Sequence, residues 1–278
     1  MKIQVLYSQG SASIQEDAII FHPPLYFGVT DGISGVYLPN EKPRLIDGKT
    51  GGQLASHAIV KSFIDAKPGK SLENIIKEAN NTIRAISEEN GLSFQETEFL
   101  PCAGFVVASI DQKINILQAG DSLAIWKMKD GSLEGTPNRT YKYEKHLLST
   151  IAKLMKKYRG DREKMWKEFA PILIKERRKY FNTDKGGFAL LNGQPEFEKF
   201  LQKFELRRDD VKLLILFTDG FVPSEYTRSV SSMAKFVADF YQKGGLQRVL
   251  RETRKIAKQN RSLTHIDYPE ATAIAIEF

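Results

Sequence analysis

The sequence places the same Thr-Asp-Gly triplet twice, each time at the end of an apolar, strand-like segment. FGVTDGISG spans residues 27–35, and LLILFTDGF spans residues 213–221. Val, Ile and Phe in the segments before the triplets favour β-strands. An Asp-Gly pair is also a common hairpin-turn signal. The pair Asp130-Gly131 lies between polar neighbours, and we interpret it as such a turn. Two triplets after strongly apolar strands favour a functional role for their acids over two plain turns.

Two further acidic clusters lie beside apolar strands. Glu16 and Asp17 come directly before AIIF, and Asp267 and Glu270 come before ATAIAIEF, the last segment of the sequence. If these strands are neighbours in the fold, their acids and those of the two triplets converge at one rim. Unpaired carboxylates that lie close together repel and raise one another's pKa.

A hard divalent cation relieves such repulsion and prefers oxygen ligands. We therefore predict one metal cluster that the triplet acids Asp31 and Asp219 hold from two sides. The glycine after each Asp is expected to let the backbone turn sharply. It also exposes a backbone carbonyl that can bind a metal.

Strand and helix patterns follow one another without a regular alternation, which predicts an α+β fold of antiparallel sheets with helices packed outside. The length of 278 residues suits one domain, residues 1–278. Strands are predicted at 2–8, 17–22, 26–30, 102–110, 114–120, 122–128, 211–218 and 271–278. Helices are predicted at 52–66, 71–90, 146–160, 161–181, 233–243 and 245–260.

Five short motifs in this order resemble the metal-dependent Ser/Thr protein phosphatases of the PPM family (type 2C), over nearly the whole chain. They are QEDA (15–18), VTDGISG (29–35), QAGDSLAIW (118–126), LFTDGF (216–221) and YPEATAIAI (268–276). The resemblance implies two packed antiparallel sheets flanked by helices, in a four-layer α-β-β-α order. It also implies a site that holds two metal ions, Mn²⁺ or Mg²⁺. The reaction implied is hydrolysis of a phosphomonoester, either a phosphoprotein or a small phosphoester.

The resemblance also assigns roles to individual residues. Asp31 resembles the ligand that bridges both metals, and the Gly32 carbonyl resembles a ligand of one of them. Asp219 resembles a ligand of the other metal, so Asp31 and Asp219 are the expected catalytic residues. Glu16 and Asp17 match the acidic pair that binds metal directly or through water.

The last metal ligand of the family has two candidates here. Alignment on Thr272 puts Pro269 where the family has its final Asp, with Glu270 in the next position. Asp267 lies two residues before Pro269, so a bulge or a shifted turn must bring it to the metal. We favour Asp267 and keep Glu270 as the second choice.

Two other segments bear on the site. Asp121 and Ser122 match the family's Gly-Asp-Ser segment, where we expect a structural turn and no metal ligation. Many family members bind phosphate with an Arg just before the acidic pair, but GSASIQED, residues 10–17, contains no basic residue. Phosphate binding would then depend on the metals or on Lys and Arg from elsewhere, or it would be weak.

Three histidines could take part in proton transfer or in packing. His22 and His57 are candidates for a general acid, although packing or surface roles are the alternatives for both. His265 neighbours the last acidic cluster and could support a ligand there.

The positive charge of the chain is concentrated in one segment. The formal net charge is +7, whereas residues 139–185 contain 15 Lys and Arg against 6 Asp and Glu, or +9, so the remainder sums to −2. The region at about 139–190 is expected to be a basic helical insertion in the place of the family's flap. It could present a solvated basic face, steer anionic substrates as a lid, or bind an acidic partner. No groove-reading motif is present, so nucleic acid is the least favoured partner.

Composition limits the remaining functions. Hydrophobic residues make up 41% of the chain, but no run approaches the length of a membrane span. The single Cys102 and an N-terminus without a secretory pattern favour a cytoplasmic protein. Three functional hypotheses remain: a metal-dependent phosphatase, a catalytically weakened phosphatase-like binding module, and a nucleic-acid binder.

Overall fold

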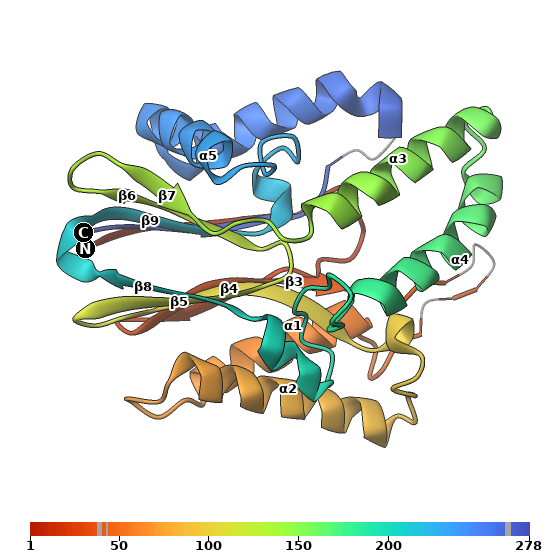
Figure 1. The fold of residues 1–278 in the computed structure, drawn as a ribbon, viewed down its shortest axis with the longest axis horizontal. Helices are drawn as coiled ribbons and strands as arrows, with labels where there is room; N and C mark the ends of the chain where they lie inside the picture. The colour runs from red at the N-terminus through yellow and green to blue at the C-terminus, as the bar shows by residue number, and fades with distance from the viewer. Residues whose placement is uncertain (38–40, 43, 265–267) are drawn as a thin grey trace.

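Two five-stranded antiparallel sheets stack face to face at the centre of the molecule (Figure 1). The computed structural model describes residues 1–37, 41–42, 44–264 and 268–278. The first sheet has the order β1 (Lys2–Ser8), β10 (Ala271–Glu277), β9 (Val211–Phe217), β6 (Leu123–Met128), β7 (Leu133–Gly135). The second has the order β2 (Ala18–His22), β3 (Tyr26–Ile33), β4 (Cys102–Ile110), β5 (Lys113–Ala119), β8 (Gln202–Arg207).

The strands are apolar on both faces because both faces of each sheet are covered. In β10, Ala271, Ala273 and Ala275 pack with residues of α5 (Val230–Thr264), whereas Ile274 and Ile276 pack against the other sheet. Successive side chains of a strand point to opposite faces. The small residues therefore allow the helix to approach the sheet, and the large ones fill the space between the sheets.

Helices cover the outer face of each sheet (Figure 1). Helices α1 (Gly51–Ile64) and α2 (Leu72–Glu89) lie on the second sheet, and α5 lies on the first. This is the predicted four-layer α+β arrangement, which is confirmed. Short 3₁₀ helices complete the fold: η1 (Thr97–Phe99), η2 (Pro195–Phe200), η3 (Arg208–Asp210) and η4 (Asp219–Phe221). In the described part of the chain, every helix is too short or too polar to cross a bilayer.

The basic segment forms a pair of helices at the end of the sandwich opposite to the chain termini (Figure 1). Helices α3 (Tyr141–Lys157) and α4 (Arg162–Tyr180) pack on each other and on Val36, which follows β3. Trp166 Nε1 donates to the Tyr37 carbonyl oxygen at 2.5 Å. In addition, Arg178 Nε donates to Glu98 Oε2 at 2.8 Å. Both contacts attach α4 to the segments beside β3.

Five elements differ markedly from those predicted. Strand β7 was not predicted because it has only three residues. Strand β8 was not predicted because charged residues alternate with its apolar ones. Helix α3 begins at Tyr141 and not at 146. Strand β3 continues through Ile33, three residues beyond its predicted end. The two predicted C-terminal helices are joined as α5 across a non-helical break at Gly244-Gly245.

Candidate active site

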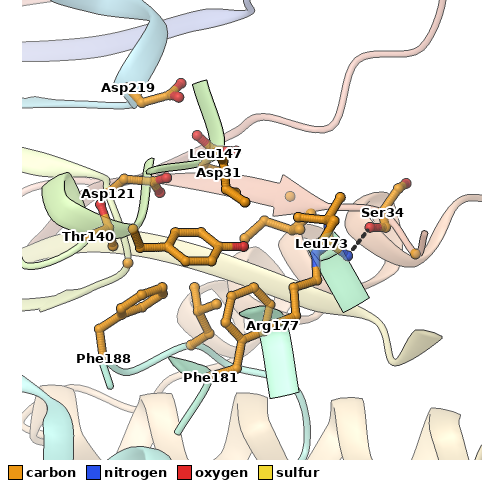
Figure 2. A pocket seen from close by; sticks show the side chains of 16 residues that line it. Asp31, Ser34, Asp121, Thr140, Leu147, Leu173, Arg177, Phe181, Phe188 and Asp219 are labelled. Atoms are coloured by element: carbon orange, nitrogen blue, oxygen red, sulfur yellow. Dashed lines mark hydrogen bonds between the residues drawn. The ribbon is translucent and has the colours of Figure 1, made fainter. Parts of the chain in front are cut away.

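Asp31 and Asp219 lie close together although they belong to different sheets. Asp31 lies in β3, opposite Gly104 of β4, and Asp219 begins η4 directly after β9. Both residues line a cavity of about 420 Å³ (Figure 2). They also line a second cavity of about 270 Å³. The two Thr-Asp-Gly triplets therefore meet at the same end of the sandwich.

The electrostatics of these two acids indicate a site crowded with negative charge. Burial raises the pKa of Asp31 well above its usual value, and the negative charge of Asp219 raises it further. Asp219 is exposed as a whole residue, yet burial of its carboxyl group is the largest cause of its raised pKa, followed by the charge of Asp121. Interaction with Asp31 offsets part of that rise. A cluster of this kind favours either protonation or a bound cation.

Asp17 is buried beside the two triplets. Its Oδ2 accepts hydrogen bonds from Thr218 Oγ1 at 2.8 Å and from Thr272 Oγ1 at 2.7 Å. Burial raises its pKa to about 7, even though both hydroxyl bonds lower it. Asp17 also lines the second cavity together with Asp31 and Asp219. Asp17 thus lies beside Asp31 and Asp219, and its role as a metal ligand stays a prediction.

Glu270 and Glu16 use their carboxylates in local hydrogen bonds. Glu270 Oε2 accepts from the backbone N–H of Glu16 at 2.7 Å and of Asp17 at 2.8 Å, and the residue lines the second cavity. Glu16 Oε1 accepts from the hydroxyls of Ser34 and Thr50. Glu16 lines neither of the two cavities. Its carboxylate instead ties the loop after β3 to the start of α1.

Asp267, the favoured candidate for the last ligand, lies outside the described residues, as does His265. Of the other histidines, His22 forms a 2.8 Å hydrogen bond between Nδ1 and the Phe63 carbonyl oxygen, and His57 is exposed on α1. Neither of them lines the two cavities. Packing and surface roles therefore account for His22 and His57.

Asp121 lies in the same cavity, although the sequence suggested only a structural turn (Figure 2). Its Oδ1 is buried and has no hydrogen-bond partner among the described residues. Burial raises its pKa. The available signal was an acid followed by a polar residue directly after an apolar strand, the same placement as Asp219. The family resemblance, however, implied only a turn at this position.

The glycines after the two triplet acids serve close packing, which differs from the sharp turn expected. Neither Gly32 nor Gly220 has a positive φ. A Cβ on Gly32 would lie 2.6 Å from the Gly52 carbonyl oxygen, and one on Gly220 would lie 1.7 Å from the Glu270 carbonyl oxygen. By contrast, Gly131 has φ +93° with open space around it, as the predicted hairpin turn requires.

The helical insertion also contributes to the site. Tyr143 of α3 and Arg177 of α4 line the cavity that contains Asp31. Burial raises the pKa of Glu144 to about 7, and the charge of Asp121 raises it as well. Tyr143 and Glu144 were not predicted as site residues, because the apolar spacing predicts a helix that begins only at residue 146.

The acids lie around the site without forming a closed coordination shell. Within the described ranges, no three His, Cys, Asp or Glu side chains come together in a group that could hold a metal ion as they stand. Like charges favour such separation. The carboxylates of Asp31, Asp121 and Asp219 nevertheless supply the oxygen donors that Mg²⁺ and Mn²⁺ prefer. One of these oxygens, Asp121 Oδ1, is buried and has no hydrogen-bond partner among the described residues.

No family model and no curated protein matches this sequence. Solved structures do match its fold. The Mycobacterium tuberculosis serine/threonine phosphatase PstP/Ppp has a TM-score of 0.56 at 15% identity, and the match covers 100% of this chain and 98% of that one. Stp1 from Staphylococcus aureus has a TM-score of 0.56 at 16% identity, with 100% and 94% covered.

A third structure is the catalytic domain of serine/threonine protein phosphatase PstP in complex with two manganese ions. It has a TM-score of 0.53 at 16% identity and covers 99% of this chain and 97% of that one. This chain therefore has the fold of bacterial PPM-type Ser/Thr phosphatases over its whole length, and the predicted resemblance is confirmed at the level of the fold.

Proposed function

We propose that this protein is a metal-dependent Ser/Thr phosphoprotein phosphatase that hydrolyses phosphomonoesters with two divalent cations. The observation that supports this function best is the convergence of Asp31 and Asp219 from two sheets on one cavity, where each carries a raised pKa. The fold shared with bacterial Ser/Thr phosphatases supports the same reaction.

Asp31, the Gly32 carbonyl and Asp219 are the proposed principal ligands, and Asp17 is a further ligand, directly or through water. Glu270 and Asp121 adjoin the same cavities and can complete the coordination. The further predicted ligands, Glu16 and Asp267, remain proposals. Two divalent cations bound there would neutralise the carboxylates, lower the pKa of a water molecule and stabilise charge on the phosphoryl group.

The residues of the chain prepare this site in two ways. The hydroxyls of Thr218 and Thr272 hold the Asp17 carboxylate in one orientation. The absent side chains at Gly32 and Gly220 let the backbones of the acidic segments approach closely. Pre-set ligands of this kind reduce the entropy lost when a cation or substrate binds.

A second candidate function is a phosphatase-like binding module with weakened catalysis. One observation favours it: the carboxylates of Glu16 and Glu270 are already engaged by hydroxyl and backbone donors. Such a module would bind one metal ion or none and would hydrolyse phosphomonoesters weakly or not at all.

The experiment that separates the two functions is hydrolysis of an aryl phosphate and of a phosphothreonine peptide. We expect the purified chain to cleave both with Mn²⁺ and to lose that activity in EDTA. Activity that is the same in EDTA would contradict the metal-dependent reaction. A wild-type chain that binds Mn²⁺ but cleaves neither compound would support the binding module.

A further inference from the structure

We propose that Arg177, from helix α4 of the basic insertion, is the residue that binds the substrate phosphate in this protein. This inference rests on the proposed function. It addresses a gap in the sequence, because residues 10–17 before the acidic pair contain no Lys or Arg. The structure instead brings in Arg177, which lies about 160 residues later in the chain.

The first argument is position. Arg177 lines the same cavity as Asp31, Asp121 and Asp219, and Figure 2 shows it across the cavity from these acids. A phosphomonoester that enters the cavity would therefore lie between the acid side, where cations are proposed to bind, and the guanidinium. An arginine recognises phosphate with several N–H donors in a fixed plane.

The second argument is orientation. Arg177 Nη1 donates to the Ser34 carbonyl oxygen at 2.8 Å and to the Glu98 carbonyl oxygen at 3.4 Å. Neutral carbonyls hold the group in place without cancelling its charge. The neighbouring Arg178 instead forms an ion pair with Glu98 and anchors the helix. The two arginines therefore have different tasks.

The third argument is unused donor capacity. Arg177 Nε is buried and has no hydrogen-bond partner among the described residues. A buried unsatisfied donor is costly unless a ligand or water pairs with it. Tyr143 lies beside the guanidinium, and burial raises the pKa of its hydroxyl to about 12, so it adds no negative charge to the cavity. Once cations neutralise the acids of this cavity, a phosphate is the ligand that the guanidinium favours.

The test compares the full-length wild type with Arg177→Gln and with Lys175→Gln, which removes an exposed positive charge from the same helix. With Mn²⁺ present, we would measure KM and kcat for p-nitrophenyl phosphate, the inhibition constant of inorganic phosphate, and Mn²⁺ affinity by calorimetry. We expect Arg177→Gln to raise both KM and the phosphate inhibition constant by roughly 10- to 100-fold. Mn²⁺ affinity should stay within about twofold, and Lys175→Gln should match the wild type.

A merely structural role for Arg177 predicts another pattern. It would lower Mn²⁺ affinity and kcat together and leave the phosphate inhibition constant unchanged, and that result would overturn the proposal. If Arg177→Gln fails to fold, Arg177→Lys keeps the charge but loses the planar fork of donors. We then expect the phosphate inhibition constant to rise by at least about threefold. An unchanged value would overturn the proposal.

The two proposals fail in different ways. A wild-type chain with no Mn²⁺-dependent hydrolysis would contradict the proposed function, and the role of Arg177 with it. An active wild type whose Arg177→Gln variant keeps KM and the phosphate inhibition constant would contradict the Arg177 proposal alone.

Discussion

Thr218 donates a hydrogen bond to Asp17, 2.8 Å from Oγ1 to Oδ2, and so joins the end of β9 to the N-terminal acidic segment. The same hydroxyl accepts from the Thr272 backbone N–H at 3.0 Å. Asp17 is only 6% exposed, so these bonds replace most of the water that its carboxylate would otherwise have. The position of one proposed ligand therefore depends on a threonine of the second triplet.

Replacing Thr218 with Val should destabilise the protein by about 1–3 kcal/mol, because the buried Asp17 carboxylate loses one of its two hydroxyl donors and the Thr272 backbone N–H loses its acceptor. The loss should be larger at pH 8 than at pH 5, since the hydroxyl bond lowers the Asp17 pKa and favours its charged form. Urea unfolding at both pH values measures this. Thr218→Ser keeps the hydroxyl and is the matched control. Equal losses at the two pH values would contradict the role assigned to the bond.

Stability without metal should fall as pH rises. The folded-state pKa of Asp17 is raised to about 7 from an ordinary value of 3.8, and those of Asp31 and Asp219 are raised as well. Between the two pKa values the folded chain binds more protons than the unfolded chain, so the contribution is full below about pH 4 and is lost as pH rises through 7. Melting in EDTA should therefore give a lower Tm at pH 8 than at pH 5.

Added Mn²⁺ should reverse this trend, because the cation competes with protons for the same oxygens. We expect the Tm gain from Mn²⁺ to be larger at pH 8 than at pH 5. A Tm in EDTA that rises from pH 5 to pH 8 would contradict the electrostatic account of the cluster.

Neutralising one acid of the pair should separate stability from activity. Asp31→Asn should raise the Tm in EDTA at pH 8, because burial and the charge of Asp219 disfavour the Asp31 carboxylate. The same change should lower Mn²⁺-dependent hydrolysis by at least about 10²-fold, as expected when a proposed ligand to the cations is lost. Asp130→Asn, in the exposed hairpin, should change neither quantity. An Asp31→Asn variant that is less stable in EDTA and still active would contradict both assignments.

Close packing at the second triplet predicts a steric effect. Gly220→Ala should cost at least about 3 kcal/mol, because overpacking against backbone is not relieved by side-chain movement. The obstructing atom is the Glu270 carbonyl oxygen. In Gly131→Ala the new methyl group meets open space, and only the positive φ is unfavourable, so the substitution should destabilise the protein by about 1–2 kcal/mol. Urea unfolding compares the two, and an equal cost would show that the strand ends can separate freely.

Much of the fold could be predicted from sequence because its strands and helices have strong local patterns. The apolar runs before Asp31 and Asp219 and the ordered motifs predicted the two sheets and the meeting of their acids. Strand β8 was missed because its alternating charges, QKFELR, face solvent at a sheet edge and resemble a loop.

The parts of the site that were missed depend on contacts between distant segments. Arg177 lies in a helix rich in basic residues, and its sequence neighbours do not distinguish it from Arg178. Only the packing of α4 beside β3 turns Arg177 to the cavity and Arg178 to Glu98. Likewise, the hydroxyl donors that occupy Glu16 come from Ser34 and Thr50, which no local pattern connects with it.

The central claim is that Asp31 and Asp219 hold divalent cations together, and calorimetric titration with Mn²⁺ tests it most directly. We predict that the wild-type chain binds two Mn²⁺ ions and that Asp31→Asn and Asp219→Asn each lose at least one of them together with hydrolysis of the aryl phosphate. A wild-type chain that binds no Mn²⁺, or variants that bind two as tightly as the wild type, would contradict the claim.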